Sequence, residues 1–140
     1  MTENYKILAK FVKDMSSETP DIDTYLFVKD NISNYTLNID IKTKTLKDKI
    51  YQVETTLGYS DKTQNTKKSF FEMIFVTIIR LDDNLDNKSD LGKLILCDLQ
   101  NEIYPDLEKS LLNVIHSAGF GEFKINKKID FLELYNKHSN

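Results

Sequence analysis

Side chains able to do acid–base or nucleophilic chemistry are few in this sequence, and they are not grouped. The two histidines, His116 and His138, stand far apart. His116 lies near the apolar stripe of a predicted helix, where a packed or surface histidine is more common than a catalytic base. His138 lies in a C-terminal tail that is expected to fray. We therefore expect no catalytic set and no enzyme.

Signals for a metal or a cofactor are equally weak. Cys97 has no histidine at the spacing of a metal site, so we expect Cys97 to be a small, buried apolar side chain. Asp98 and Glu102 share one helical face, but without a third ligand such a pair is usually a solvated surface. The Gly-Phe-Gly run at 119–121 follows a predicted helix and not a strand, so it is not a phosphate loop. The sequence predicts no metal and no cofactor.

The stretch 69–81 is the one around which the rest of the chain must be arranged. It is rich in aromatic and β-branched residues and contains neither Gly nor Pro, so we predict a strand. Alternation puts one set of side chains on one face (Phe71, Met73, Phe75, Thr77, Ile79) and another on the opposite face (Phe70, Glu72, Ile74, Val76, Ile78). Both faces are apolar. Either the whole strand is buried in one core, or its second face needs a second sheet, a partner subunit or an apolar ligand.

Glu72 is the only acid in that apolar stretch. Three interpretations remain open for it: a position at the solvent edge, a buried acid with a partner, or a docking contact. A catalytic role has no support from a neighbouring base.

Composition excludes several classes of protein. A chain of 140 residues fits a single domain, 1–140. The net charge of −3 and the pI of about 5.4, with both signs interspersed, argue against a nucleic-acid partner. Lysines at 6, 10 and 13 interrupt the N-terminal apolar residues, so we expect no signal peptide, and no run reaches the ~18 apolar residues of a membrane span. With a single cysteine, this indicates a cytoplasmic protein without direct membrane insertion.

Three further stretches alternate as strands do, namely 5–15, 35–43 and 50–60. The segment 14–20, which ends in Pro20, is expected to end the first of them, and 46–48 to hold a turn. The apolar segment 21–30 is expected to be a connection that packs over the core or faces a ligand. Together with 69–81, these strands predict an antiparallel meander.

The C-terminal half shows helical spacing instead. Ser89 is a predicted N-cap, Pro105 is predicted to start or kink a second segment, and Gly119 is its predicted C-cap. Asp130 is predicted to cap a last helix. The sequence therefore predicts an α+β fold: a four-stranded antiparallel sheet over about 5–82, helices packed on one face over 89–136, and a tail over 137–140.

Surplus apolar strand surface without a catalytic set suits a protein that binds hydrophobic segments of other chains. A hydrophobic-ligand carrier, or a small enzyme acting on an acyl chain, would leave a similar pattern.

Several short motifs resemble, in order and spacing, those of the SecB family of protein-export chaperones. They lie at 12–20, 37–40, 51–53, 70–73, 103–105, 118–120 and 129–131, so the resemblance covers about 5–136. The acidic C-terminal tail of that family is missing. The sequence is therefore also similar to a divergent SecB-like chaperone of the kind that guards a toxin–antitoxin pair.

The resemblance implies a fold, an assembly and a function. It implies a SecB-like sheet with helices on one side, assembled as a homotetramer in which edge strands pair and long helices meet at the centre. It also implies an ATP-independent holdase that binds unfolded preproteins in apolar grooves and delivers them to the translocation ATPase SecA.

The same resemblance implies two sets of site residues. The SecA-docking residues would be Asp14, Glu18, Phe70 and Glu72. The substrate groove would comprise Ile22, Tyr25, Phe27, Phe120 and Phe123. Ordinary core packing is the alternative for the groove residues.

Overall fold

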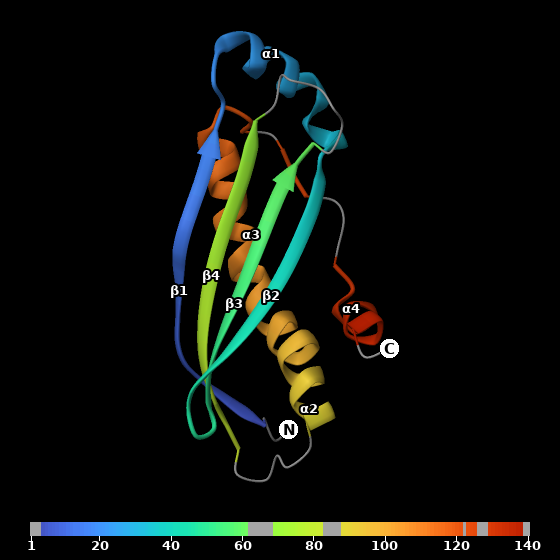
Figure 1. The fold of residues 1–140 in the computed structure, drawn as a ribbon. Helices are drawn as coiled ribbons and strands as arrows, with labels where there is room; N and C mark the ends of the chain where they lie inside the picture. The colour runs from blue at the N-terminus through green and yellow to red at the C-terminus, as the bar shows by residue number, and fades with distance from the viewer. Residues whose placement is uncertain (1–3, 62–68, 83–87, 122, 126–128, 139–140) are drawn as a thin grey trace.

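The computed structural model describes residues 4–61, 69–82, 88–121, 123–125 and 129–138. In chain order the elements are β1 (Tyr5–Glu18), α1 (Ile22–Asn31), the 3-10 turn η1 (Ile32–Asn34), β2 (Thr36–Lys47), β3 (Ile50–Ser60), β4 (Phe70–Leu81), α2 (Lys88–Lys93), the π turn η2 (Leu94–Asp98), α3 (Leu99–Ser117) and α4 (Phe131–His138). The strands form one sheet, α3 runs along one face of it, and α1 lies across one end (Figure 1). The predicted α+β class is confirmed.

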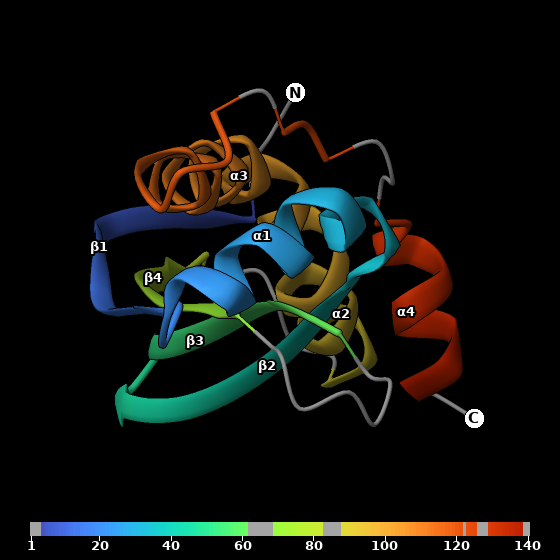
Figure 2. The ribbon, with the colours of Figure 1, turned by 90° about the horizontal axis from the view of Figure 1, so that it is seen from above.

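The sheet has the strand order β1-β4-β3-β2, and all its pairs are antiparallel. The predicted meander holds for β2, β3 and β4 but is wrong for β1, which pairs with β4 instead of β2. The reason is α1, which crosses the end of the sheet and carries the chain from one edge to the other (Figure 2). Strands β1 and β2 are therefore the two edges.

The face of the sheet that meets α3 is the core. Of the two sets of side chains predicted for this strand, the one from Phe71 to Ile79 is buried here, with Phe71 1% and Ile79 0% exposed. Residues of α3 spaced four apart lie against it and are 0% exposed: Leu99, Ile103, Leu107, Leu111 and Ile115. Burial of each such side chain contributes about 2 kcal/mol, so this contact dominates the stability of the fold.

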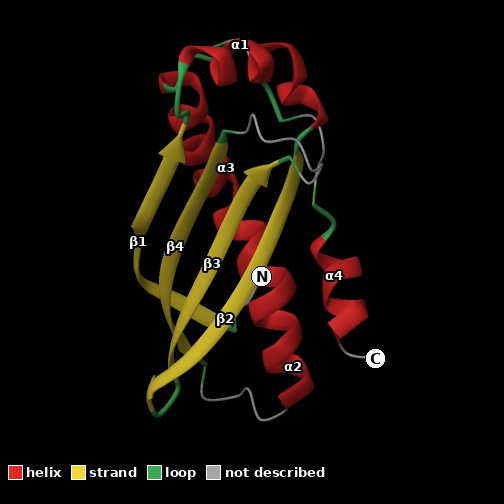
Figure 3. Cartoon of the chain, turned by 45° about the horizontal axis from the view of Figure 1, so that its top comes forward, coloured by secondary structure: helices red, strands yellow, loops and turns green. Residues whose placement is uncertain are grey.

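The opposite face, here called the outer face, carries no helix in the described part of the chain (Figure 3). On β4 it exposes Phe70 and Glu72, half-buries Ile74 and Ile78, and buries Val76 at 1% exposed. Val76 is covered because it lies between β1 and β3 in the sheet, opposite Phe11 and Glu54. The apolar side chains predicted on this face are therefore only partly exposed to solvent.

The segment 21–30, expected to be a connection, is instead helix α1. Asp21 is its N-cap, and the Asp21 carboxylate accepts a hydrogen bond of 2.8 Å from the amide of Thr24. The strand before it also runs further than expected, to Glu18, because its last residues pair with the start of β4. Strand β2 likewise continues to Lys47, and the turn passes through Lys49 at a φ of 64°.

α3 runs through Pro105, so the predicted start of a second segment at this residue is wrong. Pro105 lies on the exposed side of α3, where the freed carbonyl of Asn101 has access to water. The irregular step comes earlier, at the π turn, where the Leu99 amide bonds the Leu94 carbonyl five residues back. α2 begins at Lys88, one residue before the predicted cap Ser89.

The two remaining helix signals are confirmed. Gly119 has a φ of 107°, its amide bonds the His116 carbonyl, and the Phe120 amide bonds the Ile115 carbonyl, which is a Schellman cap on α3. The Asp130 carboxylate accepts from the amide of Glu133 at 3.1 Å. α4 continues to His138. Residue 137, which was predicted to begin the C-terminal tail, therefore still belongs to the helix. A Lys137–Glu133 ion pair of 3.6 Å lies in its last turns.

Candidate functional site

Four residues predicted for docking, here called the acidic docking surface (Asp14, Glu18, Phe70, Glu72), lie together on the outer face. The strand register pairs Glu18 with Phe70, Ser16 with Glu72, and Asp14 with Ile74. Directly paired residues in an antiparallel sheet project to the same side, so all four share one face. Phe70 is 42% exposed.

The position of Glu72 excludes one of its three interpretations, the buried acid with a partner. It is exposed, and its other neighbour across the sheet is Gly58, which has no side chain to cover it. Glu72 is therefore a solvent-facing acid at one end of an apolar strand. Asp14 is also exposed and accepts a hydrogen bond of 3.2 Å from the Ser16 hydroxyl.

A second site forms where α1 meets the end of α3. The Tyr25 ring stacks on Phe120 at a centroid distance of 5.2 Å, and the Tyr25 hydroxyl donates a 2.9 Å hydrogen bond to the Gly119 carbonyl. Phe120 also meets the edge of Phe71 at 6.1 Å. The Schellman cap thus holds Phe120 between α1 and the sheet.

These residues border a hollow that we call the aromatic groove. One part, of about 420 Å³, is lined by Tyr25, Lys29, Ile32, Gly119, Phe120, Gly121 and Phe123. A second part, of about 250 Å³, is lined by Ser33, Tyr35, Leu37, Tyr59, Phe123, Lys124 and Ile125. Phe123 belongs to both walls, and its ring lies 5.1 Å from that of Tyr59.

The structure brings only part of the predicted groove set together. Tyr25, Phe120 and Phe123 line the aromatic groove, with Phe120 almost wholly buried at 5% exposed. Phe27 packs against the core and lines neither part. Ile22 does not line it either but is 67% exposed on α1.

Sequence analysis did not single out Leu26 as a candidate for binding. Leu26 is 53% exposed and lies one helical turn after Ile22, so the two form an apolar ridge on α1. The spacing of four residues was a usable signal, but it has meaning only once the segment is known to be helical.

Comparison with known proteins decides the family. The family model described as preprotein translocase subunit SecB matches residues 1–140. The chain belongs to the SecB family. The family and the protein-export chaperone function expected from the resemblance are thereby confirmed.

Relatives and solved structures agree with this assignment. A candidate protein-export protein SecB of Pelagibacter ubique is 50% identical over 140 residues and is covered completely, as is this chain. Protein-export protein SecB of Parvibaculum lavamentivorans is 22% identical, with 94% of this chain and 77% of that protein covered. The fold is similar to that of a SecB-like chaperone of Mycobacterium tuberculosis, solved with a peptide from an antitoxin (TM-score 0.60, 9% identity, 89% and 91% covered).

The groove of this SecB-family chain is uncharged at its aromatic floor. Burial raises the pKa of Tyr59 to about 12, and its hydroxyl donates a 2.7 Å hydrogen bond to the Ile32 carbonyl. Burial also raises the pKa of Tyr35, whose oxygen accepts from the Ser69 amide at 3.1 Å. Both rings are neutral at physiological pH, so this floor favours apolar and aromatic side chains.

The residues that were considered for catalysis or metal binding are either buried or engaged in structural contacts, or they lie exposed on the surface of this SecB-family fold. His116 Nε2 lies 2.8 Å from the Phe123 carbonyl oxygen, a contact that ties α3 to the groove. Cys97 is 6% exposed, and burial raises the pKa of its thiol. Asp98 and Glu102 are exposed, and Glu102 accepts a hydrogen bond from the Tyr5 hydroxyl. The described residues contain no group of three His, Cys, Asp or Glu side chains that could hold a metal.

Within the described part of the chain, no helix combines the length and the apolar character needed to cross a bilayer.

Proposed function

We propose that this SecB-family chain is a cytoplasmic, ATP-independent holdase that binds unfolded preproteins at the aromatic groove and delivers them to SecA. The observation that carries the proposal is the combination of a groove with an uncharged aromatic floor and an exposed apolar ridge, Ile22 and Leu26, on the neighbouring helix. Such a surface offers many weak contacts and few directional ones, which suits clients of unrelated sequence. We propose no catalytic activity for it.

Client binding would depend on apolar burial and backbone pairing together. Each side chain of a client that enters the groove contributes roughly 25 cal/mol per Å² of apolar area removed from water. The edge strands β1 and β2 can add hydrogen bonds to an extended client. A client would leave by folding or by transfer to a partner, so its release needs no nucleotide.

We propose that SecA docks at the acidic docking surface. Asp14, Glu18 and Glu72 supply exposed negative charge, and Phe70 supplies an apolar anchor beside Glu18 and Glu72. An exposed aromatic side chain next to acids of like charge is the arrangement expected of a salt-sensitive docking contact.

We propose that the working form is a homotetramer, a dimer of dimers. Strand β1 supports this, because it is an edge strand of 14 residues with Leu8, Phe11 and Val12 between 40% and 50% exposed. A second copy pairing along β1 would remove that apolar surface from water.

The holdase proposal is tested with an aggregating client. The double variant Ile22→Ser/Leu26→Ser should suppress aggregation several-fold less well than the unchanged protein, because it removes the apolar ridge and nothing from the core. Leu132→Ser is the matched control, since Leu132 is 49% exposed on α4, away from the groove. Light scattering of the client measures the effect. Equal protection by all three proteins would contradict the assignment of the ridge.

The neighbouring structure with an antitoxin peptide suggests a second partner class. At 9% identity that likeness shows the fold alone, whereas the 50% identical relative bears an export description. A pull-down with SecA and with the antitoxins of the same organism separates the two. Capture of an antitoxin and not of SecA would contradict the export proposal.

A further inference from the structure

A charged pair joins β1 to α3 near the middle of the edge strand. Lys10 lies opposite Thr77 of β4, so its side chain is on the face of the sheet that meets α3. There the Lys10 ammonium donates a 2.7 Å hydrogen bond to the Asp106 carboxylate, and both side chains are half-exposed. An inward-pointing charge on an edge strand opposes pairing with an arbitrary chain, so Lys10 affects which partner β1 accepts.

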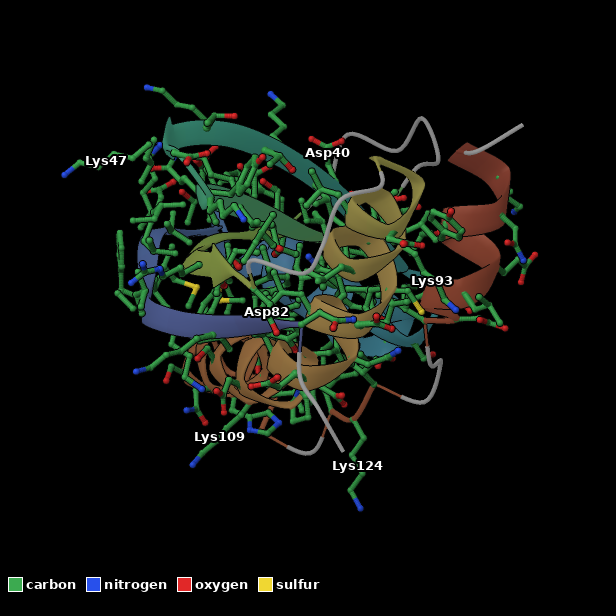
Figure 4. All side chains as sticks on the ribbon, turned by 90° about the horizontal axis from the view of Figure 1, so that it is seen from below. Asp40, Lys47, Asp82, Lys93, Lys109 and Lys124 are labelled. Carbon is green, nitrogen blue, oxygen red and sulfur yellow. The ribbon has the colours of Figure 1, made fainter. Side chains whose placement is uncertain are left out.

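Few other charges face this pair in the stretches 4–61 and 88–121, which contain both of its members. Glu102, one turn before Asp106 on α3, already accepts a hydrogen bond from β1. Lys109 projects from α3 on the side away from β1 (Figure 4). Lys13 is paired with Glu54 at 2.6 Å on the outer face. The charge near the middle of β1 on the α3 side therefore depends mainly on Lys10 and Asp106.

The middle of β1 is also where a second copy that pairs fully along this strand has its twofold axis. Directly opposed residues of an antiparallel pair project to the same side, so the axis passes through one residue and its own copy. Phe11 is next to the midpoint of β1 and next to the midpoint of the regular run 9–12 between the two register shifts. It is 50% exposed, and a second Phe11 opposite it would remove both rings from water. These features place the axis at Phe11.

An axis at Phe11 brings the two Lys10 side chains together on the face that meets α3. Lys10 then lies opposite the partner's Val12, and the two Lys10 residues are diagonal neighbours roughly 8 Å apart. Two ammonium groups that close repel each other, whereas the two Asp106 carboxylates supply equal and opposite charge. The interface is therefore neutral at its centre only when each copy brings both members of the pair.

Given the assembly through β1 proposed above, on which this inference rests, we propose that Lys10 and Asp106 of two copies form a network of four alternating charges at the axis. This network makes a second copy the preferred partner of β1. A second copy supplies an ammonium and a carboxylate in matching positions, whereas an arbitrary client strand supplies neither. β1 is thereby kept for assembly, and the aromatic groove for clients.

A disulfide tests where the axis lies. Phe11→Cys in the full-length protein should give a disulfide-linked dimer on mild oxidation, because directly opposed Cα atoms lie about 5 Å apart, within the range of a disulfide. Cys97 is 6% exposed and should not take part. Thr43→Cys on the other edge strand, β2, is the control and should stay unlinked. The absence of a link in Phe11→Cys would contradict the assembly through β1 itself, and the network with it.

Mixing of two charge variants tests the network. Lys10→Asp leaves only acids on this side of the axis, and Asp106→Lys leaves two bases on each copy. Each variant alone should dissociate into monomers at a concentration about tenfold higher than the unchanged protein does, because like charges then meet at the axis. An equimolar mixture should associate nearly as tightly as the unchanged protein, since the acids of one copy face the bases of the other. Sedimentation velocity over a dilution series measures both effects.

Matched controls make the same changes of charge on β2. Lys42→Asp and Asp40→Lys should leave association unchanged, because β2 is the other edge strand and Asp40 lies across the molecule from α3 (Figure 4). The exchanged variant Lys10→Asp/Asp106→Lys should associate like the unchanged protein. Circular dichroism checks that every variant is folded.

Two results would overturn the network while the disulfide in Phe11→Cys still supported the assembly. One is association of both single charge variants as tight as that of the unchanged protein. The other is a mixture that associates no better than either variant alone, which would show that Lys10 and Asp106 act only within one chain.

Discussion

Gly119 is the residue on which the geometry of the aromatic groove depends. Its φ of 107° is one that other residues adopt only with strain, and a Cβ there would lie 2.6 Å from Cε1 of Tyr25. Gly119→Ala should therefore lower the free energy of unfolding by about 2 kcal/mol and displace Tyr25 from Phe120. Urea unfolding measures the first effect.

Gly58→Ala is the control for that substitution, because a Cβ at this strand position meets nothing within 4 Å. It should leave the unfolding free energy nearly unchanged or slightly raised. If the two alanine variants had the same stability, the strained cap would not hold the groove.

Glu72 gives the second residue-level prediction, on SecA docking. Glu72→Lys should weaken SecA binding about tenfold, since one exposed attraction becomes a repulsion. The protein should keep its oligomeric mass, because Glu72 faces solvent on the outer face. Calorimetry with SecA measures the change.

Glu133→Lys is the matched charge reversal for this docking test, on α4 and away from the outer face. Unchanged affinity of the Glu72 variant, or an equal loss in both variants, would remove Glu72 from the docking surface.

At the scale of elements, Gln100 joins α3 to the sheet. Gln100 is 0% exposed, its carbonyl accepts a 3.1 Å hydrogen bond from the Thr55 hydroxyl, and its amide donates to the Ile95 carbonyl in the π turn. Gln100→Leu should cost about 2 kcal/mol of unfolding free energy, because a buried hydroxyl and a carbonyl lose a partner.

Adding Thr55→Val to Gln100→Leu should restore about 1 kcal/mol, since one of the two orphaned groups is then removed. Urea unfolding of both single variants and the double variant gives the coupling. Additive losses would mean that the 3.1 Å contact contributes nothing to stability.

The elements that sequence reasoning found were those with a clear local signal. The stretch 69–81 is rich in aromatic and β-branched residues, contains neither Gly nor Pro, and is strand β4, and Gly119 and Asp130 are caps as expected. Helix α1 was missed because apolar residues lie on several sides of it and no single stripe shows. Asp21, directly after Pro20, could have indicated the start of α1, because aspartate is a preferred N-cap residue.

The site could be predicted only where the resemblance supplied it. No spacing rule brings Asp14 and Glu72 together, because they lie on strands far apart in sequence that become neighbours only through the crossover of α1. Phe120 was expected to face a client but lies mostly beneath the groove, since the Schellman cap turns it inward. Burial of this kind depends on packing, which sequence patterns do not reveal.

At the scale of the whole molecule, the prediction concerns assembly through β1. Leu8→Lys/Val12→Lys should shift the mass in solution from tetramer toward smaller species, because both residues are at least 40% exposed on this edge strand. Light scattering measures the mass. Ile22→Ser/Leu26→Ser is the control and should leave it unchanged. A monomeric unmodified protein would contradict the proposed tetramer.

The two register shifts in β1, between Ile7 and Ala9 and between Val12 and Asp14, have a further consequence. A protein that handles unfolded chains is exposed to endless strand addition, which leads to fibres. Each shift interrupts the row of free backbone groups and increases the local twist, so β1 is divided into short regular runs on either side of the shifts and between them. The edge that can accept one partner is thereby a poor template for a growing filament.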